Sequence, residues 1–405
     1  METTIDIHAI HEIRCRTHLY LGVGAINKCN DIFADLKRKG IERLLIVTGR
    51  SSYIKCGAWA PVEKALAANG IAYVLYNGAL PNPEHQQVDE AVALGQGLKA
   101  QAVLGIGGGS PIDTAKSAAI LLAYPGKTCK ELYTYAFTPD KALPVVAINT
   151  THGTGTEVNR FAVVSIPEMN FKPAIAYDCS YPMYAIDDPA LMVHLPASQT
   201  LYVSLDALNH VTEAATTIIA SSYSILLAKE TIRLVAKYLP AAIKDANDLT
   251  ARYHLVYASA IAGIAFDNSL LHYTHALEHP LSAIKTDLTH ALGLSILLPS
   301  VLKTIYASKS QVLNEIYAPI VPGLTGTAAD ALKLAAGVEQ WLGTMGVTQK
   351  LGDEGFTPSQ IPELIKLAQE TPALGLLLSM SPVPATEETI RRIYAESFAP
   401  ISQML

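Results

Sequence analysis

The stretch GIGGGSPIDTAK, residues 105–116, decides how the first half of this chain is interpreted. It follows an apolar run that predicts a strand, and it opens a segment with helical spacing. Its three consecutive glycines let the backbone approach a ligand closely, and Pro111 suits a first helical turn whose free amides attract phosphate. A dinucleotide fingerprint G-x-G-x-x-G would need glycine at Ser110. We therefore predict a phosphate-binding loop, with a tight strand-to-helix turn as the alternative.

Outward from this loop, the first half of the chain alternates two periodicities. Short β-branched runs predict strands at 43–47, 71–76, 102–106 and 143–148, and helical stretches separate most of them, at 57–68, 84–99 and 113–124. Further strand-like pieces lie at 161–166, 174–177 and 184–186. Strands separated by helices of this length form right-handed crossovers in a parallel sheet that is covered on both faces. This alternation predicts an α/β, doubly wound nucleotide-binding domain.

From Ser198 onward the pattern changes to long segments rich in Ala, Leu and Ile with helical spacing. These segments predict an all-helical C-terminal domain, with helices at 200–220, 221–245, 252–266, 270–283, 291–306 and 327–345. We expect the boundary near residue 190, which gives a dinucleotide-binding domain at 1–190 and a metal-binding and substrate domain at 191–405.

Composition excludes several classes of protein. Of the 405 residues, 50% are hydrophobic and 16% charged, which is typical of a globular chain and not of a disordered one. The formal net charge is −6 and no long basic run occurs, so a nucleic-acid partner is not expected. Five scattered cysteines predict reduced thiols. An acidic start without an apolar h-region, and no unbroken apolar stretch of about 18 residues, predict a cytoplasmic protein without a membrane partner.

A second polar loop, Asn149–Glu157, also follows a buried-looking strand. Its hydroxyls and glycines could bond a nicotinamide ribose or phosphates, whereas the alternative is a turn that caps the next element. The helical half carries a stronger signal. Asp206 and His210 are four residues apart, His275 and His279 repeat that spacing, and His290 follows. Each histidine alone could be an ordinary core residue, but together they suit a divalent first-row ion, either Fe²⁺ or Zn²⁺.

These motifs resemble those of the iron-containing alcohol dehydrogenases over essentially the whole chain. The family pattern G-G-G-S-x-x-D-x-x-K corresponds to residues 107–116, T-T-x-G-T-G-S/T-E to 150–157, D-A-L-x-H to 206–210, and H-A-x-x-H-x-L to 275–281. The resemblance implies a dehydroquinate synthase-like fold. It implies Fe²⁺, with Zn²⁺ possible in vitro, on four ligands: Asp206, His210, His275 and His290. Three positions depart from the family pattern: Asn149 and Thr289 stand where Pro is common, and His152 where Ala is expected.

The resemblance implies an alcohol dehydrogenase or aldehyde reductase that transfers a hydride between NAD(P)(H) and a small primary alcohol or aldehyde. His279 is the expected catalytic residue, as a proton relay, with a packing role as its alternative. A dehydroquinate-synthase-like lyase, a glycerol-dehydrogenase-like polyol oxidoreductase and a non-catalytic nucleotide sensor share the fold and stay open as alternatives. We also expect a homo-oligomer, namely a dimer.

The turn after the strand at 43–47 bears on cofactor choice. It holds Gly49, Arg50 and Ser51 where an acidic residue would bind the adenosine ribose, so NADP(H) is favoured over NAD(H). The alternative is that Arg50 only caps the turn in solvent. Arg160 and Lys172 could meet an acidic substrate group, an interpretation that we do not favour. The expected cofactor-binding residues are Gly49, Arg50, Ser51, Gly107, Gly108, Gly109, Ser110, Asp113, Thr150, Thr151, Thr154, Thr156 and Lys172.

Overall fold

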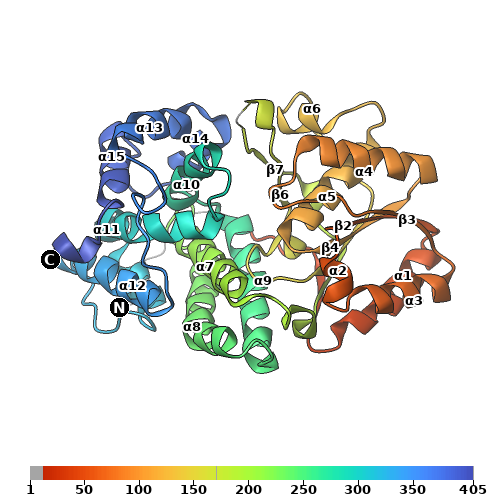
Figure 1. Cartoon of the computed structure of the whole chain (residues 1–405), viewed down its shortest axis with the longest axis horizontal. Coiled ribbons are helices and arrows are strands. Elements are labelled where there is room, and N and C mark those ends of the chain that lie inside the picture. The colour runs from red at the N-terminus through yellow and green to blue at the C-terminus, as the bar shows by residue number, and fades with distance from the viewer. Residues whose placement is uncertain (1–11, 170, 405) are drawn as a thin grey trace. The chain divides into compact units, whose positions relative to one another are not determined.

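The computed structural model describes residues 12–169 and 171–404, which form two compact units (Figure 1). The α/β unit comprises residues 15–200 together with 244–264, and the helical unit comprises 12–14, 201–243 and 265–404. The N-terminal part of the long helix α9 (Leu249–Ser269) therefore groups with the α/β unit, beyond the expected boundary near residue 190. A single division of the chain at residue 190 stays a prediction.

The α/β unit is built on a parallel sheet of six strands in the order β1-β8-β5-β4-β2-β3. All neighbouring strands in it pair in parallel. After β2 the chain moves outward to β3, whereas after β4 it moves the other way to β5, so the topological switch point lies between β2 and β4. The strands are β1 (His18–Leu21), β2 (Arg43–Thr48), β3 (Ala72–Tyr76), β4 (Ala102–Gly107), β5 (Val145–Asn149) and β8 (Tyr184–Asp187).

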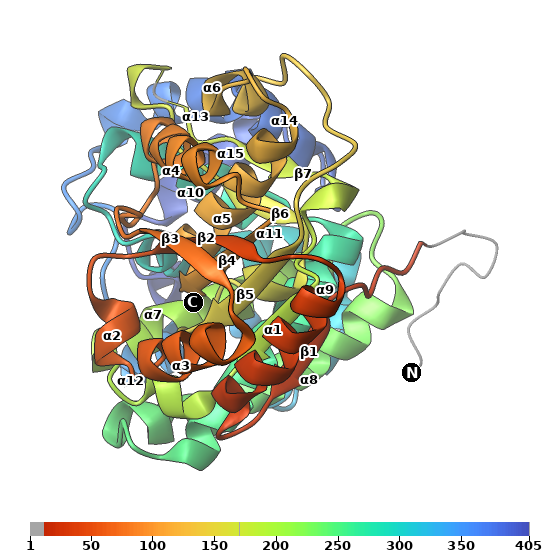
Figure 2. The same ribbon diagram turned by 90° about the vertical axis from the view of Figure 1, so that its right-hand side faces the viewer.

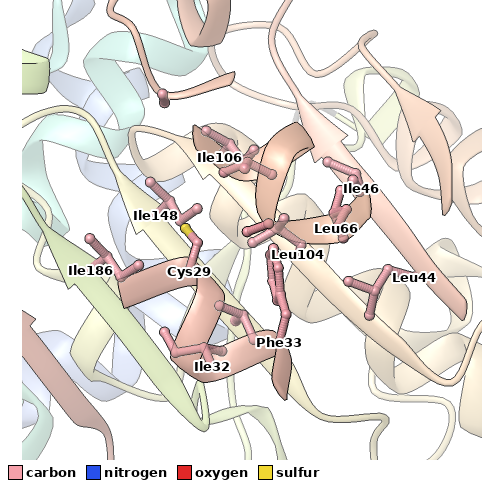
Figure 3. Packing of buried hydrophobic residues seen from close by; sticks show 14 of the residues in the cluster. Cys29, Ile32, Phe33, Leu44, Ile46, Leu66, Leu104, Ile106, Ile148 and Ile186 are labelled. Carbon is pink, nitrogen blue, oxygen red and sulfur yellow. The ribbon is translucent and has the colours of Figure 1, made fainter. Parts of the chain in front are cut away.

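Helices cover both faces of this sheet, as Figure 2 shows. Successive side chains of a strand point to opposite faces. Leu44 and Ile46 of β2 accordingly pack with α1 (Cys29–Arg38) and α3 (Trp59–Asn69), in the cluster drawn in Figure 3. Leu45 and Val47 pack on the other face, against α4 (His85–Leu98), α5 (Gly109–Ala123) and α6 (Cys129–Tyr133). The expected α/β, doubly wound architecture is confirmed.

Two of the expected strand-like pieces are not part of the main sheet. β6 (Phe161–Val163) and β7 (Ala174–Ala176) form a separate antiparallel pair. The short helix α2 (Ser52–Lys55) follows the turn after β2. In chain order, β8 is the last strand of the main sheet. It lies inside the sheet, between β1 and β5.

The second half of the chain is helical, as expected. After α9 come α10 (Tyr273–Ile284), α11 (His290–Tyr317), α12 (Ala331–Thr344), α13 (Ile361–Glu370), α14 (Pro372–Ser379) and α15 (Glu387–Glu396); before it lie α7 (Ala197–Ala214) and α8 (Ser222–Lys244). By length and composition α11 could cross a membrane, but 78% of its most apolar window is buried inside the fold. Because α10, α12 and α15 all pack against α11, its apolar character is that of a central core helix.

Candidate metal and nucleotide sites

Three helices of the helical unit bring the expected metal ligands together. Asp206 and His210 lie one turn apart on α7, His275 lies in the first turn of α10, and His290 is the first residue of α11. Oδ1 of Asp206 is 3.7 Å from Nε2 of His210 and 3.6 Å from Nε2 of His275. Ligand atoms of Asp206, His275 and His290 all lie within 4.8 Å of one another. One cation could therefore contact side chains from all three helices.

Rings and burial reinforce this cluster. The rings of His210 and His275 stack at 4.7 Å between centroids, and His210 also stacks on Phe266 at 4.5 Å. Oδ1 of Asp206 and Nε2 of His275 are buried, and neither has a hydrogen-bond partner among the residues that the structure describes. Since buried polar atoms are normally paired, these two atoms fit a bound metal ion.

The charge of the cluster also fits a cation. Burial raises the pKa of the Asp206 carboxyl, but the neighbouring histidines outweigh burial and bring that pKa to about 2. Burial lowers the pKa of the His275 imidazole, but Glu213 and Asp206 outweigh it and raise that pKa to about 10. Without a metal ion, the carboxylates thus hold a proton on His275. A divalent cation would satisfy the same negative charge and displace that proton.

Glu213 of α7 is a functional residue that the sequence reasoning missed. Its carboxylate accepts a hydrogen bond from Nδ1 of His275, and it also accepts from the backbone N–H of Thr274 at 2.5 Å and of His272 at 3.3 Å. Such a carboxylate fixes the tautomer of a metal-binding histidine, so that Nε2 faces the metal. Spacing within α7 does not reveal this contact, because His275 lies on another helix.

Glu278 of α10 was missed as well. Its carboxylate bonds to Nδ1 of His290, so each of the two ligand histidines of α10 and α11 has its own glutamate. His279, the expected proton relay, is half-buried, and its ring centroid lies 5.6 Å from that of His290. The expected catalytic residue is therefore next to the last ligand.

In the α/β unit, the glycine-rich loop begins where β4 ends, at the switch point of the sheet. Gly107 has φ 153°, and a Cβ there would lie 2.5 Å from Cγ of Pro111. The next two glycines pack against the second polar loop: a Cβ on Gly108 would lie 2.9 Å from Thr151, and one on Gly109 would lie 3.0 Å from Thr154. The two expected nucleotide-binding loops are thus in contact, and only glycine allows this close approach.

The N-terminus of α5 follows directly. Its N-cap, Gly108, offers no side-chain hydrogen bond, and Ser110 is half-buried in the first turn. The first amides of a helix lack acceptors within the helix. This end of α5 can therefore donate to a phosphate group.

Two of the expected cofactor contacts have other partners in the structure. The half-buried carboxylate of Asp113 accepts from the Thr156 hydroxyl at 2.6 Å and from the Val163 N–H at 3.0 Å. Nζ of Lys116, which is buried, donates to the same hydroxyl at 2.7 Å. These hydrogen bonds tie α5 to the second polar loop.

The other expected contacts lie on loops. Thr150 donates its N–H to the carbonyl of Gly107 at 3.0 Å, which joins the two loops again. Gly49 is half-buried and Arg50 is exposed, in the turn between β2 and α2 that also holds Ser51. Nζ of Lys172 donates to Oδ1 of Asn82 at 2.9 Å.

Two of the departures from the family pattern have local explanations. The Asn149 side chain is buried, donates to Oδ1 of Asp187 at 2.9 Å, and accepts from the N–H of Thr151 at 3.1 Å. It thereby holds the start of the second loop. Thr289 has φ −66°, a value that proline also adopts, so the backbone before His290 follows a proline-compatible path.

Comparison with known proteins agrees with this geometry. Residues 16–189 match the family described as iron-containing alcohol dehydrogenase, and residues 200–398 match its C-terminal part. The chain belongs to the iron-containing alcohol dehydrogenase family. The resemblance inferred from the motifs is confirmed, and the chain is an oxidoreductase that interconverts alcohols and aldehydes with a metal ion and a nicotinamide cofactor.

Similar proteins cover most of the chain. A long-chain primary alcohol dehydrogenase of Thermoanaerobacter ethanolicus is 58% identical over 98% of this chain and 100% of its own length. A 1,3-propanediol dehydrogenase of Klebsiella pneumoniae is 31% identical over 89% of this chain and 92% of its own. Among solved structures, the NADH-dependent butanol dehydrogenase of Thermotoga maritima is 27% identical with a TM-score of 0.84, covering 96% of this chain and 98% of its own.

Proposed function

We propose that this family member is an iron-dependent primary alcohol dehydrogenase and aldehyde reductase whose metal ligands are Asp206, His210, His275 and His290. The observation that carries the assignment is the convergence of ligand atoms from three helices within 4.8 Å, including buried atoms of Asp206 and His275 that make no hydrogen bond to the described residues. Oxygen and nitrogen donors of this kind suit Fe²⁺, and Zn²⁺ could replace it in vitro.

Asp206, His210, His275 and His290 would hold the ion, which would supply Lewis-acid polarisation of the alcohol or aldehyde oxygen and a lower pKa of the alcohol hydroxyl. The protein supplies the surroundings. Glu213 and Glu278 hold the rings of His275 and His290, so that the ligand nitrogens stay aimed at one point. His279, beside His290, holds or accepts the proton exchanged with the substrate oxygen, a role that imidazole side chains take in many enzymes.

The α/β unit binds the nicotinamide cofactor in this proposal. Gly107, Gly108, Gly109 and Ser110 offer backbone N–H groups to the pyrophosphate at the N-terminus of α5. Thr150, Thr151 and Thr154 form the second wall of this loop, and the contact between the loops keeps both in position. We assign Asp113 and Thr156 to holding the loops together, and we propose no direct ligand contact for them.

Gly49, Arg50 and Ser51 favour NADP(H) over NAD(H), because this turn holds a cation and a hydroxyl in place of a carboxylate. The turn follows β2, next to β4 at the switch point of the sheet, where dinucleotides bind in such folds. The exposed guanidinium of Arg50 is available for an adenosine 2′-phosphate. Lys172, close to Asn82, serves the cofactor as a more distant cation.

The substrate that we propose is an unbranched aliphatic primary alcohol or its aldehyde. The sequence alone favoured a small substrate, but the relative that is 58% identical is named for long-chain alcohols. In a series of aldehydes from two to twelve carbons, we expect kcat/KM to rise with chain length. We further propose a cytoplasmic homodimer, which analytical ultracentrifugation tests.

Absorbance at 340 nm tests the proposed function, with NADPH or NADH, aldehydes and Fe²⁺ under anaerobic conditions. We expect aldehyde-dependent oxidation of the reduced cofactor, and a lyase would give none. Replacing His275 with Ala should remove bound metal and turnover together, because the replacement deletes a ligand buried at the centre of the cluster. Unchanged activity of this variant in metal-free buffer would falsify the assignment.

A further inference from the structure

His290 is the metal ligand that its own backbone holds least firmly. It is the first residue of α11, and its side chain is 30% exposed, whereas those of Asp206, His210 and His275 are at most 9% exposed. Its N-cap, Thr289, makes no side-chain capping bond. Another group must therefore fix which ring nitrogen of His290 faces the other ligands.

Glu278 supplies that group from the neighbouring helix. Its side chain is wholly buried, and its Oε2 pairs with Nδ1 of His290. An ionised carboxylate only accepts hydrogen bonds, so the pairing keeps the hydrogen on Nδ1. Nε2 of His290 is then left with a free lone pair as the ligand atom.

The Glu278 carboxylate is itself held in place. The hydroxyl of Ser282, one turn further along α10, donates to its other oxygen, Oε1. Gly293 of α11 packs against the same side chain, because a Cβ at Gly293 would be 2.8 Å from Cγ of Glu278 and 3.0 Å from Oε1. A larger residue at position 293 would displace the carboxylate, so α11 has glycine where Glu278 enters the interface between the helices.

We propose that Glu278 is a positioning residue of the metal site, which orients His290 and thereby slows release of the metal ion. The inference rests on the proposed metal function of the four ligands. The pairing of Glu278 with His290 resembles that of Glu213 with His275. Two carboxylates outside the ligand set therefore each hold one ligand ring. Both also add negative charge around the cation.

Two substitutions separate orientation from charge. Glu278→Gln keeps the size and one acceptor oxygen but removes the charge, and we expect the metal to dissociate about tenfold faster. Glu278→Ala removes the acceptor as well, and we expect dissociation about a hundredfold faster. Gly293→Ala removes no polar group, yet its Cβ would push Glu278 away, so it should also speed metal loss.

The experiment uses the full-length protein loaded with Co²⁺, whose visible absorption reports ligand geometry. Release is followed after excess chelator is added, and circular dichroism verifies that each variant is folded. The matched control is Glu339→Gln, because Glu339 pairs with Lys350 and the N–H of Ile401 in the same unit and lies outside the ligand cluster. We expect the control to match the parent in spectrum and release rate.

The outcomes distinguish the two levels of the proposal. A folded Glu278→Ala variant that releases Co²⁺ at the rate of the parent overturns the positioning role, whereas a parent that binds no Co²⁺ overturns the metal site itself. An altered Co²⁺ spectrum with faster release in Glu278→Ala, together with partial recovery in Glu278→Gln, supports the role. Turnover is not needed for this decision.

Discussion

Nη1 of Arg252 donates a hydrogen bond to Nε2 of His152 at 2.9 Å, and neither side chain is exposed to solvent. The same nitrogen donates to the Thr200 hydroxyl at 2.7 Å, and Nε donates to the carbonyl of Ala246. Arg252 lies on α9, and His152 lies in the second polar loop of the α/β unit. The family pattern leads one to expect Ala at position 152, so in this chain a buried side-chain bond holds the loop.

The first prediction is that His152→Ala weakens cofactor binding more than it slows turnover. The change removes one of the acceptors of a buried guanidinium, which costs about 1–3 kcal/mol, and it frees the loop that carries Thr151 and Thr154. We expect KM for the cofactor to rise about tenfold and kcat to fall less. Steady-state kinetics with varied cofactor measures both, and His152→Gln, which keeps an acceptor, should recover most of the loss.

The pair of His152 and Arg252 also predicts how the free energy of unfolding changes at acidic pH. Burial, reinforced by the charge of Arg252, lowers the pKa of His152 to about 3 from an ordinary 6.5. The unfolded chain therefore binds a proton that the folded one does not between these values, and the free energy of unfolding falls as pH drops from 6.5 towards 3, by about 1.4 kcal/mol per pH unit. Thermal unfolding of His152→Gln should show a flatter acid limb; identical acid limbs would contradict the assignment.

The buried carboxyl groups of Glu157 and Asp187 predict the opposite dependence, in which the free energy of unfolding falls as pH rises. Burial raises the pKa of Glu157 to about 7, and burial together with Glu157 raises the pKa of Asp187 well above its ordinary value, although Lys116 lies close by. The folded chain then binds more protons than the unfolded chain above pH 4.5, so stability falls as pH rises towards 7. Asp113 adds further negative charge to this cluster.

We therefore predict that Glu157→Gln raises the free energy of unfolding relative to the parent, and that this increase is larger at pH 8 than at pH 5. The amide removes the cost of burying a second negative charge, which at neutral pH is on the order of 1–3 kcal/mol. The measurement is the unfolding midpoint of parent and variant at both pH values. The control is Glu63→Gln, an exposed residue of α3, which should shift neither midpoint. Parallel pH profiles of parent and Glu157→Gln would rule out this explanation.

The parallel sheet and the clustering of the candidate metal ligands could be predicted because their signals are local. Buried strands such as β2 and β4 are continuous apolar runs, and ligands one turn apart on a helix repeat every four residues. No element was expected over residues 18–38, where β1 is a short, partly exposed edge strand and α1 has a mixed composition. Such segments become ordered through the core that they cover.

The residues outside the ligand set could not be predicted in the same way. Glu213 acts on a histidine of another helix and Glu278 does the same, so their roles follow from helix packing and not from spacing within one helix. The motif that contains Asp113 predicts a ligand contact, and the structure adds that its carboxylate bonds Thr156 and Val163. A motif identifies the loop, and tertiary structure decides which side chains face inward.

Two glycines of the α/β unit give a matched prediction. Gly107→Ala should abolish cofactor binding, since φ 153° strains any side chain and the new Cβ would lie 2.5 Å from Pro111. A Cβ added to Gly97, in α4, would meet no atom of the described residues within 4 Å, so Gly97→Ala should raise stability by about 0.5–1 kcal/mol without changing kinetics. Fluorescence titration with NADPH and thermal unfolding compare the two variants. Equal cofactor affinity in both would show that the loop tolerates a side chain.

Cofactor preference can be tested at the end of β2. A Cβ on Gly49 would meet only the carbonyl of Ala79 and the Ser52 hydroxyl among the described residues, both at 3.5 Å, so Gly49→Asp fits without strain. The new carboxylate would bond the adenosine ribose of NADH and repel a 2′-phosphate. We expect the ratio of kcat/KM for NADPH over NADH to fall at least tenfold, and Arg50→Ala to lower kcat/KM for NADPH alone.

The matched control for that substitution is Gly97→Asp, which adds the same charge on the exposed face of α4. If general electrostatics set the preference, Gly97→Asp would change the ratio as much as Gly49→Asp does. If Arg50 binds the 2′-phosphate, only the changes at positions 49 and 50 will alter the ratio, and the effect of Arg50→Ala will shrink at high salt as the charge is screened. An Arg50→Ala variant with unchanged NADPH kinetics would instead identify Arg50 as a solvent-exposed turn residue, and the NADP(H) preference would lose its basis.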